Sequence, residues 1–237
     1  MSRQEKLAAL ASTGVTKAEL DNIDGGTARG TTAIADGDGV LINDAGTMRM
    51  TSVETLATYI GTKVGGGTTF IASSGAISGA ASVTFSQSAG HFDSSKYDSY
   101  IFYILNVVPV TDGADFRART STNNGSSYAT SSGDYVTYGT GNTDKISAGL
   151  GIGSAADEYG VSGFINLLNP HQAKYTHFIS NSISVQNTSG THTDQGQAVN
   201  FSSGFRKEAA DIDAIQFTMS SGNIESGEVT MFGIANS

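Results

Sequence analysis

The chain has no cysteine and no tryptophan, and only 2 of its 237 residues are proline. Without cysteine it can form no disulfide framework, thiolate nucleophile or thiolate metal site. Charged residues make up only 15% of the chain, against roughly 25% in an ordinary globular protein. Solubility must therefore come from hydroxyl and amide groups. This is common in all-β proteins with long turns, and in subunits that hide much of their surface in an assembly.

Clustered basic residues are also missing. The net charge is −9, and the longest basic run is the pair Arg206 and Lys207. Binding to phosphate backbones needs clusters of lysine and arginine, so we expect no nucleic-acid partner.

Long apolar runs do not occur either. The first six residues are not followed by an apolar core, so we expect no signal peptide. No stretch approaches the ~20 apolar residues of a membrane span, so we expect no membrane insertion. The most apolar run, residues 100–110, is about half that length and is rich in residues that favour strands.

What the sequence does contain is a break at three consecutive glycines, residues 65–67. Residues 1–64 have short helix-like and extended pieces and few aromatic residues, and we call them the leader. Residues 68–237 have short apolar runs separated by Gly, Ser, Thr, Asn and Asp, and we call them the head. This layout predicts an N-terminal anchoring segment, a glycine hinge and a β-rich head.

The leader has recognisable start and stop signals. Alternation around residues 40–42 and a turn at residues 44–46 predict a small hairpin between Thr31 and Met50. Thr51 and Glu54 have the spacing of a capping box, which predicts a helix that ends near Gly61.

None of these short elements can bury its apolar side alone, because an isolated helix of about ten residues is marginal in water. We therefore expect the leader to pack on copies of itself or on a separate scaffold; the alternative is that it folds back onto the head. The predicted interface residues are Leu7, Leu10, Leu20, Ile23, Val53, Leu56 and Ile60.

One segment of the leader resembles known proteins. The run GVTKAELDNIDGGTARGTTAIADGDGVLINDAGTMRMTSVETLATYIGTK, residues 14–63, is similar to connecting segments in tail-fibre and other virion proteins of tailed bacteriophages. The resemblance implies a homotrimeric virion component. It places the leader on or near the threefold axis, in contact with other tail or capsid proteins.

The head reads as a series of strands. Period-two alternation, clearest in residues 176–185 and 214–219, is typical of half-buried strands in an antiparallel sheet. The run Ile101 to Leu105 is apolar on both faces and predicts a central strand covered on both sides. Gly149 to Gly153 lacks the lysine of a phosphate loop and predicts a turn or a close-packed strand. The expected fold class is mainly β: an antiparallel β-sandwich, with a jelly roll as its commonest plan. The predicted strands span residues 69–72, 82–85, 100–108, 115–120, 135–138, 161–168, 176–185, 198–201, 214–219 and 228–234.

The head carries a second resemblance. The stretches FDSSKYDSYIFYILNVVPVTDGADFRARTSTNNGSSYATSSGDY and IESGEVTMFGIANS are similar to a domain of phage fibre and decoration proteins. The resemblance implies a jelly-roll module that forms trimers. The first strand lacks a tryptophan common in that domain, and Phe70 stands in its place.

Catalytic and metal-binding patterns are weak. Asp112, Asp115 and Asp134 could gather as calcium ligands, but a turn and an ion pair explain the first two more simply. The four histidines lack metal-site spacing, since only His171 and His177 lie close in sequence. No nucleophile elbow occurs, and nothing marks either acidic pair, Asp157 with Glu158 or Asp211 with Asp213, as catalytic. We predict no cofactor, no metal and no enzymatic activity.

A surface for recognition is a separate possibility. Tyr128, Tyr135, Tyr138 and Tyr159 lie in segments rich in Ser, Gly and Asn, where tyrosine can stack on a sugar or a protein at low entropic cost. The alternative is that they pack at strand ends or across a subunit interface. A host-surface glycan or protein is the partner expected for such a surface.

Together these features predict a non-enzymatic virion structural protein of a bacteriophage, assembled in the host cytoplasm. The favoured role is a homotrimeric fibre whose N-terminal segment is attached and whose head projects for host adsorption. The alternatives are a capsid decoration or cement protein and a carbohydrate-binding module.

Overall fold

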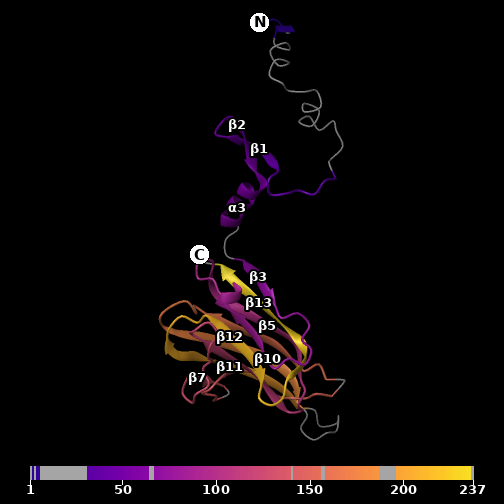
Figure 1. Ribbon diagram of the computed structural model, residues 1–237, viewed down its shortest axis with the longest axis vertical. Coiled ribbons are helices and arrows are strands. Elements are labelled where there is room, and N and C mark those ends of the chain that lie inside the picture. Colours follow the sequence, from indigo (N-terminus) through magenta and orange to yellow (C-terminus); the bar gives the residue numbers. More distant parts are fainter. Residues whose placement is uncertain are drawn as a thin grey trace. The chain divides into compact units, whose positions relative to one another are not determined.

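The structure is a computed structural model (Figure 1). It describes residues 31–63, 67–139, 141–155, 158–186 and 196–235, together with residues 2, 4 and 5. The chain divides into two compact units, Met1–Lys63 and Val64–Ser237.

The first unit contains a hairpin followed by a helix. Strand β1 (Gly39–Asp44) pairs antiparallel with β2 (Thr47–Ser52). The two turn residues, Ala45 and Gly46, both have positive φ, at 49° and 93°. Such a turn matches the right-handed twist of the flanking strands. The predicted hairpin is confirmed.

Helix α3 (Val53–Lys63) follows directly, and its N-cap lies one residue later than predicted. The Ser52 hydroxyl accepts a hydrogen bond from the Thr55 amide at 3.1 Å, which satisfies one of the free donors of the first turn. Ser52, and not Thr51, is therefore the capping residue. The Thr51–Glu54 capping box was wrong, because the helix begins at Val53 and the hydroxyl of Ser52, directly before it, accepts from the first turn.

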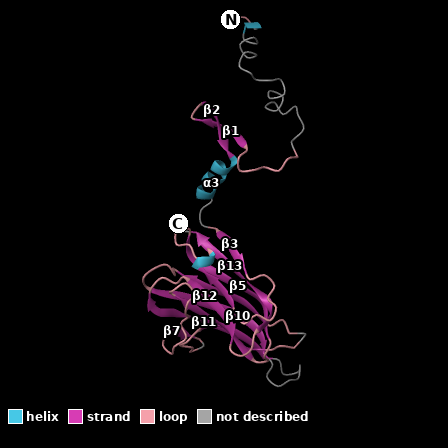
Figure 2. Cartoon of the chain, viewed as in Figure 1, coloured by secondary structure: helices cyan, strands magenta, loops and turns pink. Residues whose placement is uncertain are grey.

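The second unit, the head, consists almost entirely of strands (Figure 2). The predicted strands all form, and most extend further at their ends. The strands are β3 (Thr68–Ser73), β4 (Val83–Ser86), β5 (Tyr97–Pro109), β6 (Ala114–Ser121), β7 (Tyr135–Tyr138), β8 (Ile146–Ile152), β9 (Val161–Leu168), β10 (Tyr175–Gln186), β11 (Gly196–Ala209), β12 (Ala214–Met219) and β13 (Ile224–Ala235), with a short 3-10 helix at Gln87–Ala89.

The strands form two layers. The larger sheet has the order β3-β13-β5-β9-β10-β11-β7, and the smaller sheet has the order β8-β6-β12-β4. The pairing of Gln186 on β10 with Ile152 on β8 joins the two into one hydrogen-bonded sheet of 11 strands. All strand pairs are antiparallel. The predicted fold class, an antiparallel β-sandwich in a mainly β chain, is confirmed.

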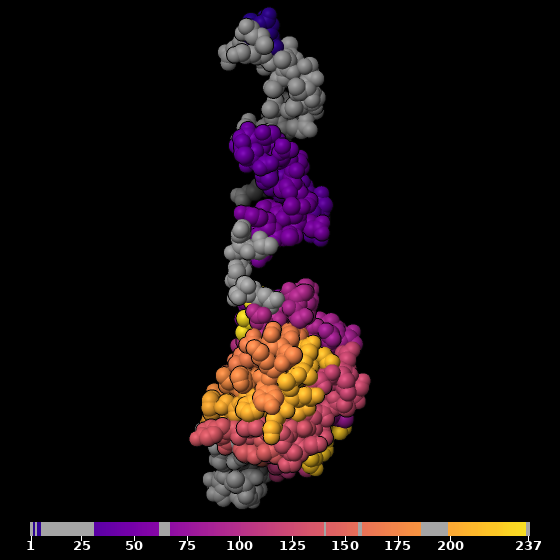
Figure 3. Space-filling view, turned by 90° about the vertical axis from the view of Figure 1, so that its left-hand side faces the viewer, coloured from indigo at the N-terminus to yellow at the C-terminus, as the bar shows by residue number. Residues whose placement is uncertain are grey.

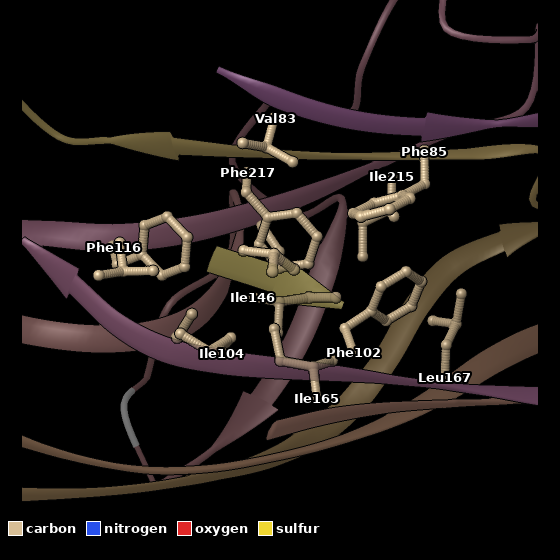
Figure 4. Packing of buried hydrophobic residues seen from close by; sticks show 14 of the residues in the cluster. Val83, Phe85, Phe102, Ile104, Phe116, Ile146, Ile165, Leu167, Ile215 and Phe217 are labelled. Atoms are coloured by element: carbon tan, nitrogen blue, oxygen red, sulfur yellow. The ribbon is translucent and has the colours of Figure 1, made fainter. Parts of the chain in front are cut away.

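The core lies between the two layers, where aromatic side chains from both sheets point toward one another (Figure 4). Phe102 of the larger sheet lies 5.6 Å from Phe217 and 5.7 Å from Phe85 of the smaller sheet, between ring centroids. Phe217 also stacks on Phe116 at 5.7 Å. Ring pairs at these distances add a specific attraction to the burial of apolar area.

Strand β8 contains most of the segment for which the sequence left two possibilities, a turn or a close-packed strand. It forms a close-packed strand and not a turn: a Cβ at Gly149 would lie 2.9 Å from a methyl carbon of Val161. Opposite it, the buried Ser180 hydroxyl donates to the Ser147 carbonyl at 2.7 Å. Small residues let this strand approach the neighbouring layer closely, which periodicity alone does not indicate.

Strand β5 differs from its prediction. Tyr100, Phe102 and Ile104 are buried in the core, but Tyr103 and Leu105 are exposed. Among the residues that the structure describes, the strand is therefore covered on one face only. Its second apolar face belongs to the surface of the head.

Candidate functional site

The outer face of the larger sheet is the main candidate site. It carries large apolar side chains on six adjacent strands, and we call this surface the apolar face. Its members are Phe70, Ile101, Tyr103, Leu105, Phe164, Ile179, Ile183, Val199, Phe201 and Phe232.

The strand register places these side chains on one side of the sheet. Tyr103 is paired with Phe164, Phe164 with Asn181, and Asn181 with Phe201. Residues directly opposite in neighbouring strands point to the same face. In a parallel row, Ile183 is paired with Val199. In Figure 3 the later strands, coloured orange to yellow, form part of the head surface turned toward the viewer.

Aromatic rings dominate the half of the apolar face that β3, β13, β5 and β9 form. Phe232 lies 5.9 Å from Phe70 and 5.6 Å from Tyr103, in edge-to-face arrangements. Tyr103 lies 6.4 Å from Phe164. Tyr103 is nevertheless 48% exposed, so these rings contact one another without being covered.

The other half, on β10 and β11, carries the aliphatic residues Ile179, Ile183 and Val199 together with Phe201. Val199 is 70% exposed and Ile183 is 47% exposed. Beside Ile183 lies a hollow of about 150 Å³, whose wall includes Tyr159, Gly160 and Val185. A side chain of another molecule could enter this hollow.

The outer face of the smaller sheet has the opposite chemistry. On β6, Arg117 and Arg119 alternate with buried residues and point outward. Arg119 lies 3.2 Å from Asp144, which also pairs with Lys145 at 3.0 Å. Burial alone would raise the pKa of Asp144, but the hydrogen bonds and charges of Lys145 and Arg119 outweigh it and lower that pKa. This face is adapted to water, and the apolar face is not.

The first unit also leaves apolar side chains uncovered. Of residues 31–61, whose exposure the structure describes, none is buried. Met50 is 71% exposed and Tyr59 is 59% exposed. Of the predicted interface residues on α3, Val53 and Leu56 are half-buried and Ile60 is exposed. The other four, Leu7, Leu10, Leu20 and Ile23, lie outside the described residues.

The four predicted recognition tyrosines do not form one patch. Tyr138 and Tyr159 are exposed, at 82% and 76%. Tyr135 is fully buried, so its assignment to a surface was wrong. Its hydroxyl accepts from the Thr120 amide at 2.9 Å, and the Arg206 guanidinium lies 5.4 Å from its ring centroid.

Tyr128 is half-buried and lines a different cavity, of about 340 Å³. Half of the residues in its wall are Ser or Thr, and Asn123, Asp134, Arg206 and Glu208 add further polar groups. Arg206 is held by Asp134 at 3.3 Å and by Glu208 at 2.6 Å. The result is a polar pocket beside an aromatic ring.

The aspartates weighed as calcium ligands lie in separate interactions. Asp112 accepts from the Ser154 amide, Asp115 accepts from the Gly151 amide, and Asp134 pairs with Arg206. Within the described part of the chain, no group of three or more acidic or histidine side chains could hold a metal ion.

A network of hydrogen-bonded polar groups lies at one end of the sandwich, and the sequence did not reveal it. The Asp93 amide donates to the Tyr100 hydroxyl at 2.8 Å, and this hydroxyl lies 2.7 Å from His171 Nε2. His171 Nδ1 lies 3.0 Å from the Asp211 carboxylate. In the neutral imidazole, Nδ1 donates to the carboxylate and Nε2 accepts from Tyr100. Burial raises the pKa of Tyr100 to about 12, which keeps this donor protonated.

Comparisons with known proteins identify no relative: no protein-family model and no curated protein matches the chain. Among the helices in the described residues, none has the length and apolar character needed to span a membrane.

Proposed function

We propose that the chain is a non-enzymatic structural protein of a bacteriophage virion. It acts as a homotrimeric fibre, attached through its N-terminal segment and presenting the β-sandwich head for host adsorption. The observation that carries the proposal is the first unit, which has a well-formed hairpin and helix but no buried residue among residues 31–61. The phage setting and the number of three copies rest on the resemblance of residues 14–63 and of the head.

The physical reason is that such a unit cannot be stable alone. A two-stranded hairpin and a helix of 11 residues are each marginal in water. Met50, Tyr59 and Ile60 would gain about 1.5–3 kcal/mol each from full burial. Neighbouring copies or an attachment partner can supply that cover.

The polar groups of the head support a structural role. Glu158, which the sequence offered as half of an acidic pair, is buried and accepts from the Ala155 amide at 2.8 Å. Asp211, from the other pair, orients His171. Both carboxylates fix loops in place through these hydrogen bonds.

The polar cavity beside Tyr128 supports the adsorption role. Hydroxyl groups, a carboxylate and an aromatic ring are the groups that bind a neutral saccharide. Saturation-transfer NMR with a panel of methyl glycosides should show binding that Tyr128→Ala abolishes and Tyr138→Ala keeps. If no glycoside binds, the adsorption role must use another surface, and the assembly role is unaffected.

The mass of the full chain in solution tests the proposal itself. Sedimentation should give three times the 24.4-kDa mass of one chain. Leu56→Asp should lower this mass or expose residues 31–63 to protease. Thr58→Asp, on the opposite side of α3, should change neither. A compact monomer whose residues 31–63 resist protease would contradict the proposal.

A further inference from the structure

We infer that the apolar face is a second interface, through which the heads of neighbouring copies of this chain pack against one another. The inference rests on the homo-oligomer proposed above. All members of the apolar face belong to the head.

The first argument is the contrast between the two outer faces of the sandwich. Both are antiparallel sheet faces of one domain, and an exposed sheet face normally carries polar residues. The smaller sheet follows this rule with Arg117, Arg119, Gln216 and Thr218, whereas the larger sheet carries Tyr103 and Phe201 at equivalent outward positions. One protein with both kinds of face indicates that one faces water and the other faces protein.

The second argument is area. Aromatic side chains have roughly 150–250 Å² each and large aliphatic ones somewhat less, so ten that are partly or half exposed present on the order of 700–800 Å². The largest apolar patch of a typical monomer is only about 300–600 Å². The apolar face exceeds such a patch and is as large as the roughly 800 Å² that one partner buries in a standard interface; shared between two neighbours, it gives each contact about half of that area per partner.

The third argument identifies the occupant as another copy of the same chain. A chain of net charge −9 repels its copies, so a contact between copies needs a surface without charge. Along the paired rows that carry the apolar face, the residues between the apolar ones are Asn166, Asn181 and Ser162. The one charged member, Glu228, lies at the margin, where the hydroxyls of Ser73 and Thr230 donate to it.

The two halves of the apolar face differ, which suggests how the copies fit. The half around Phe70 and Tyr103 projects aromatic rings, and the half around Ile183 has the hollow of about 150 Å³. If the half on β3, β13, β5 and β9 of one copy packs on the half on β10 and β11 of the next, the contact is heterologous. Such contacts form a ring where the rotation between copies closes, and an open filament where it does not. A ring of three heads satisfies both halves of every copy.

The absence of cysteine provides a direct test, because each introduced cysteine is then the sole thiol in the chain. Leu105→Cys and Val199→Cys are placed on the apolar face, and Thr84→Cys is an exposed control on the smaller sheet. In the assembled full chain, maleimide should label the first two about tenfold more slowly than the control, because a thiol reacts only where solvent reaches it. In denaturant all three should react alike.

A second test perturbs the interface. Leu105→Lys combined with Ile183→Lys should raise the dissociation constant of the assembly about 100-fold or more, because both charges would lose water on assembly. Thr84→Lys should leave it unchanged, and circular dichroism should report intact sheets in every variant.

The outcomes separate this inference from the proposed function. If the wild-type chain is oligomeric but Leu105→Cys and Val199→Cys react as fast as the control, the apolar face is not the interface and the proposed assembly stands. If the wild-type chain is a monomer at all concentrations, both proposals are wrong. Protection of both thiols, together with dissociation of the lysine variant, supports the inference.

Discussion

Tyr103 on β5 is paired with Phe164 on β9, and their rings lie 6.4 Å apart on a face of the sheet that the described residues of the head leave exposed. On the opposite side of the same strand, Phe102 lies in the core between Phe85 and Phe217. Strand β5 thus carries aromatic residues on both faces, but the described residues bury only one of them. The uncovered face links the fold to the proposed assembly.

One prediction concerns Phe217 in the hydrophobic core, whose ring contacts those of Phe85, Phe102 and Phe116. Phe217→Ala should lower the free energy of unfolding by about 3–5 kcal/mol, because it removes buried apolar area and leaves a cavity between the layers. Denaturant titration measures the loss. Val110→Ala, at an exposed position outside the core, should change the free energy by less than about 0.5 kcal/mol. A small loss at Phe217 would mean that the layers can close over the gap.

Replacement of Tyr100 should show how much the hydrogen-bond network at the end of the sandwich contributes to the free energy of unfolding. Tyr100→Phe leaves the Asp93 amide and His171 Nε2 without their present partner. A buried polar group left unpaired costs about 1–3 kcal/mol, and we expect a loss of that size in unfolding free energy. Tyr159→Phe, at an exposed position, is the matched control and should be neutral. Equal stability of the two variants would show that this hydrogen-bond network makes no net contribution to the free energy of unfolding.

The same residue predicts a dependence on alkaline pH. The pKa of Tyr100 is raised to about 12 in the folded chain by burial, against about 10 for an unperturbed tyrosine. A raised pKa means that the unfolded chain loses this proton first. The stabilisation is therefore complete below pH about 10 and is lost as the pH rises toward 12. Burial also raises the pKa of Tyr135, so both tyrosines contribute to the fall. Unfolding measured across this range should show a shallower fall for Tyr100→Phe, and an identical slope would contradict the assignment.

A glycine in β9 tests the close approach of neighbouring strands. A Cβ at Gly163 would lie 2.2 Å from the Asn181 carbonyl oxygen and 2.5 Å from the Ser182 Cα, both of the backbone. Because a backbone cannot move aside as a side chain can, Gly163→Ala should separate β9 from β10 and cost about 1–3 kcal/mol. Gly37→Ala, where the new methyl group meets nothing within 4 Å, is the control. Hydrogen exchange of the β9 and β10 amides would locate the damage; unchanged protection would mean that the strands shift at little cost.

The cap of α3 gives a prediction that distinguishes two neighbouring residues. Ser52→Ala removes the hydroxyl that accepts from the Thr55 amide and should destabilise the helix by about 0.5–2 kcal/mol. Thr51→Ala should have a smaller effect, because Thr51 lies in β2 and does not cap the helix. Amide exchange at Thr55 reports the difference, and a larger effect at Thr51 would restore the capping box expected from sequence spacing.

Local signals in the sequence were sufficient to find most of the elements. Alternation in residues 176–185 and 214–219 located β10 and β12, and the turn at residues 44–46 located the hairpin, because these features depend on neighbouring residues alone. Strand β8 was not separable from a turn. Its Ser, Ala and Gly residues carry little periodicity, and their small size has meaning only where another strand packs closely against them.

The sequence by itself determined the class of fold, the two-part layout of the chain and the exclusion of all cysteine chemistry, because composition and short-range pattern suffice for each. Only the tertiary structure decided which side of β5 is covered and that Tyr135 is buried while Tyr138 is exposed. The physical reason is that burial depends on which strands, distant in sequence, lie across from a residue. The apolar run at residues 101–105 predicted a strand with two apolar faces, and only the packing of the two sheets shows which face is buried and which is exposed.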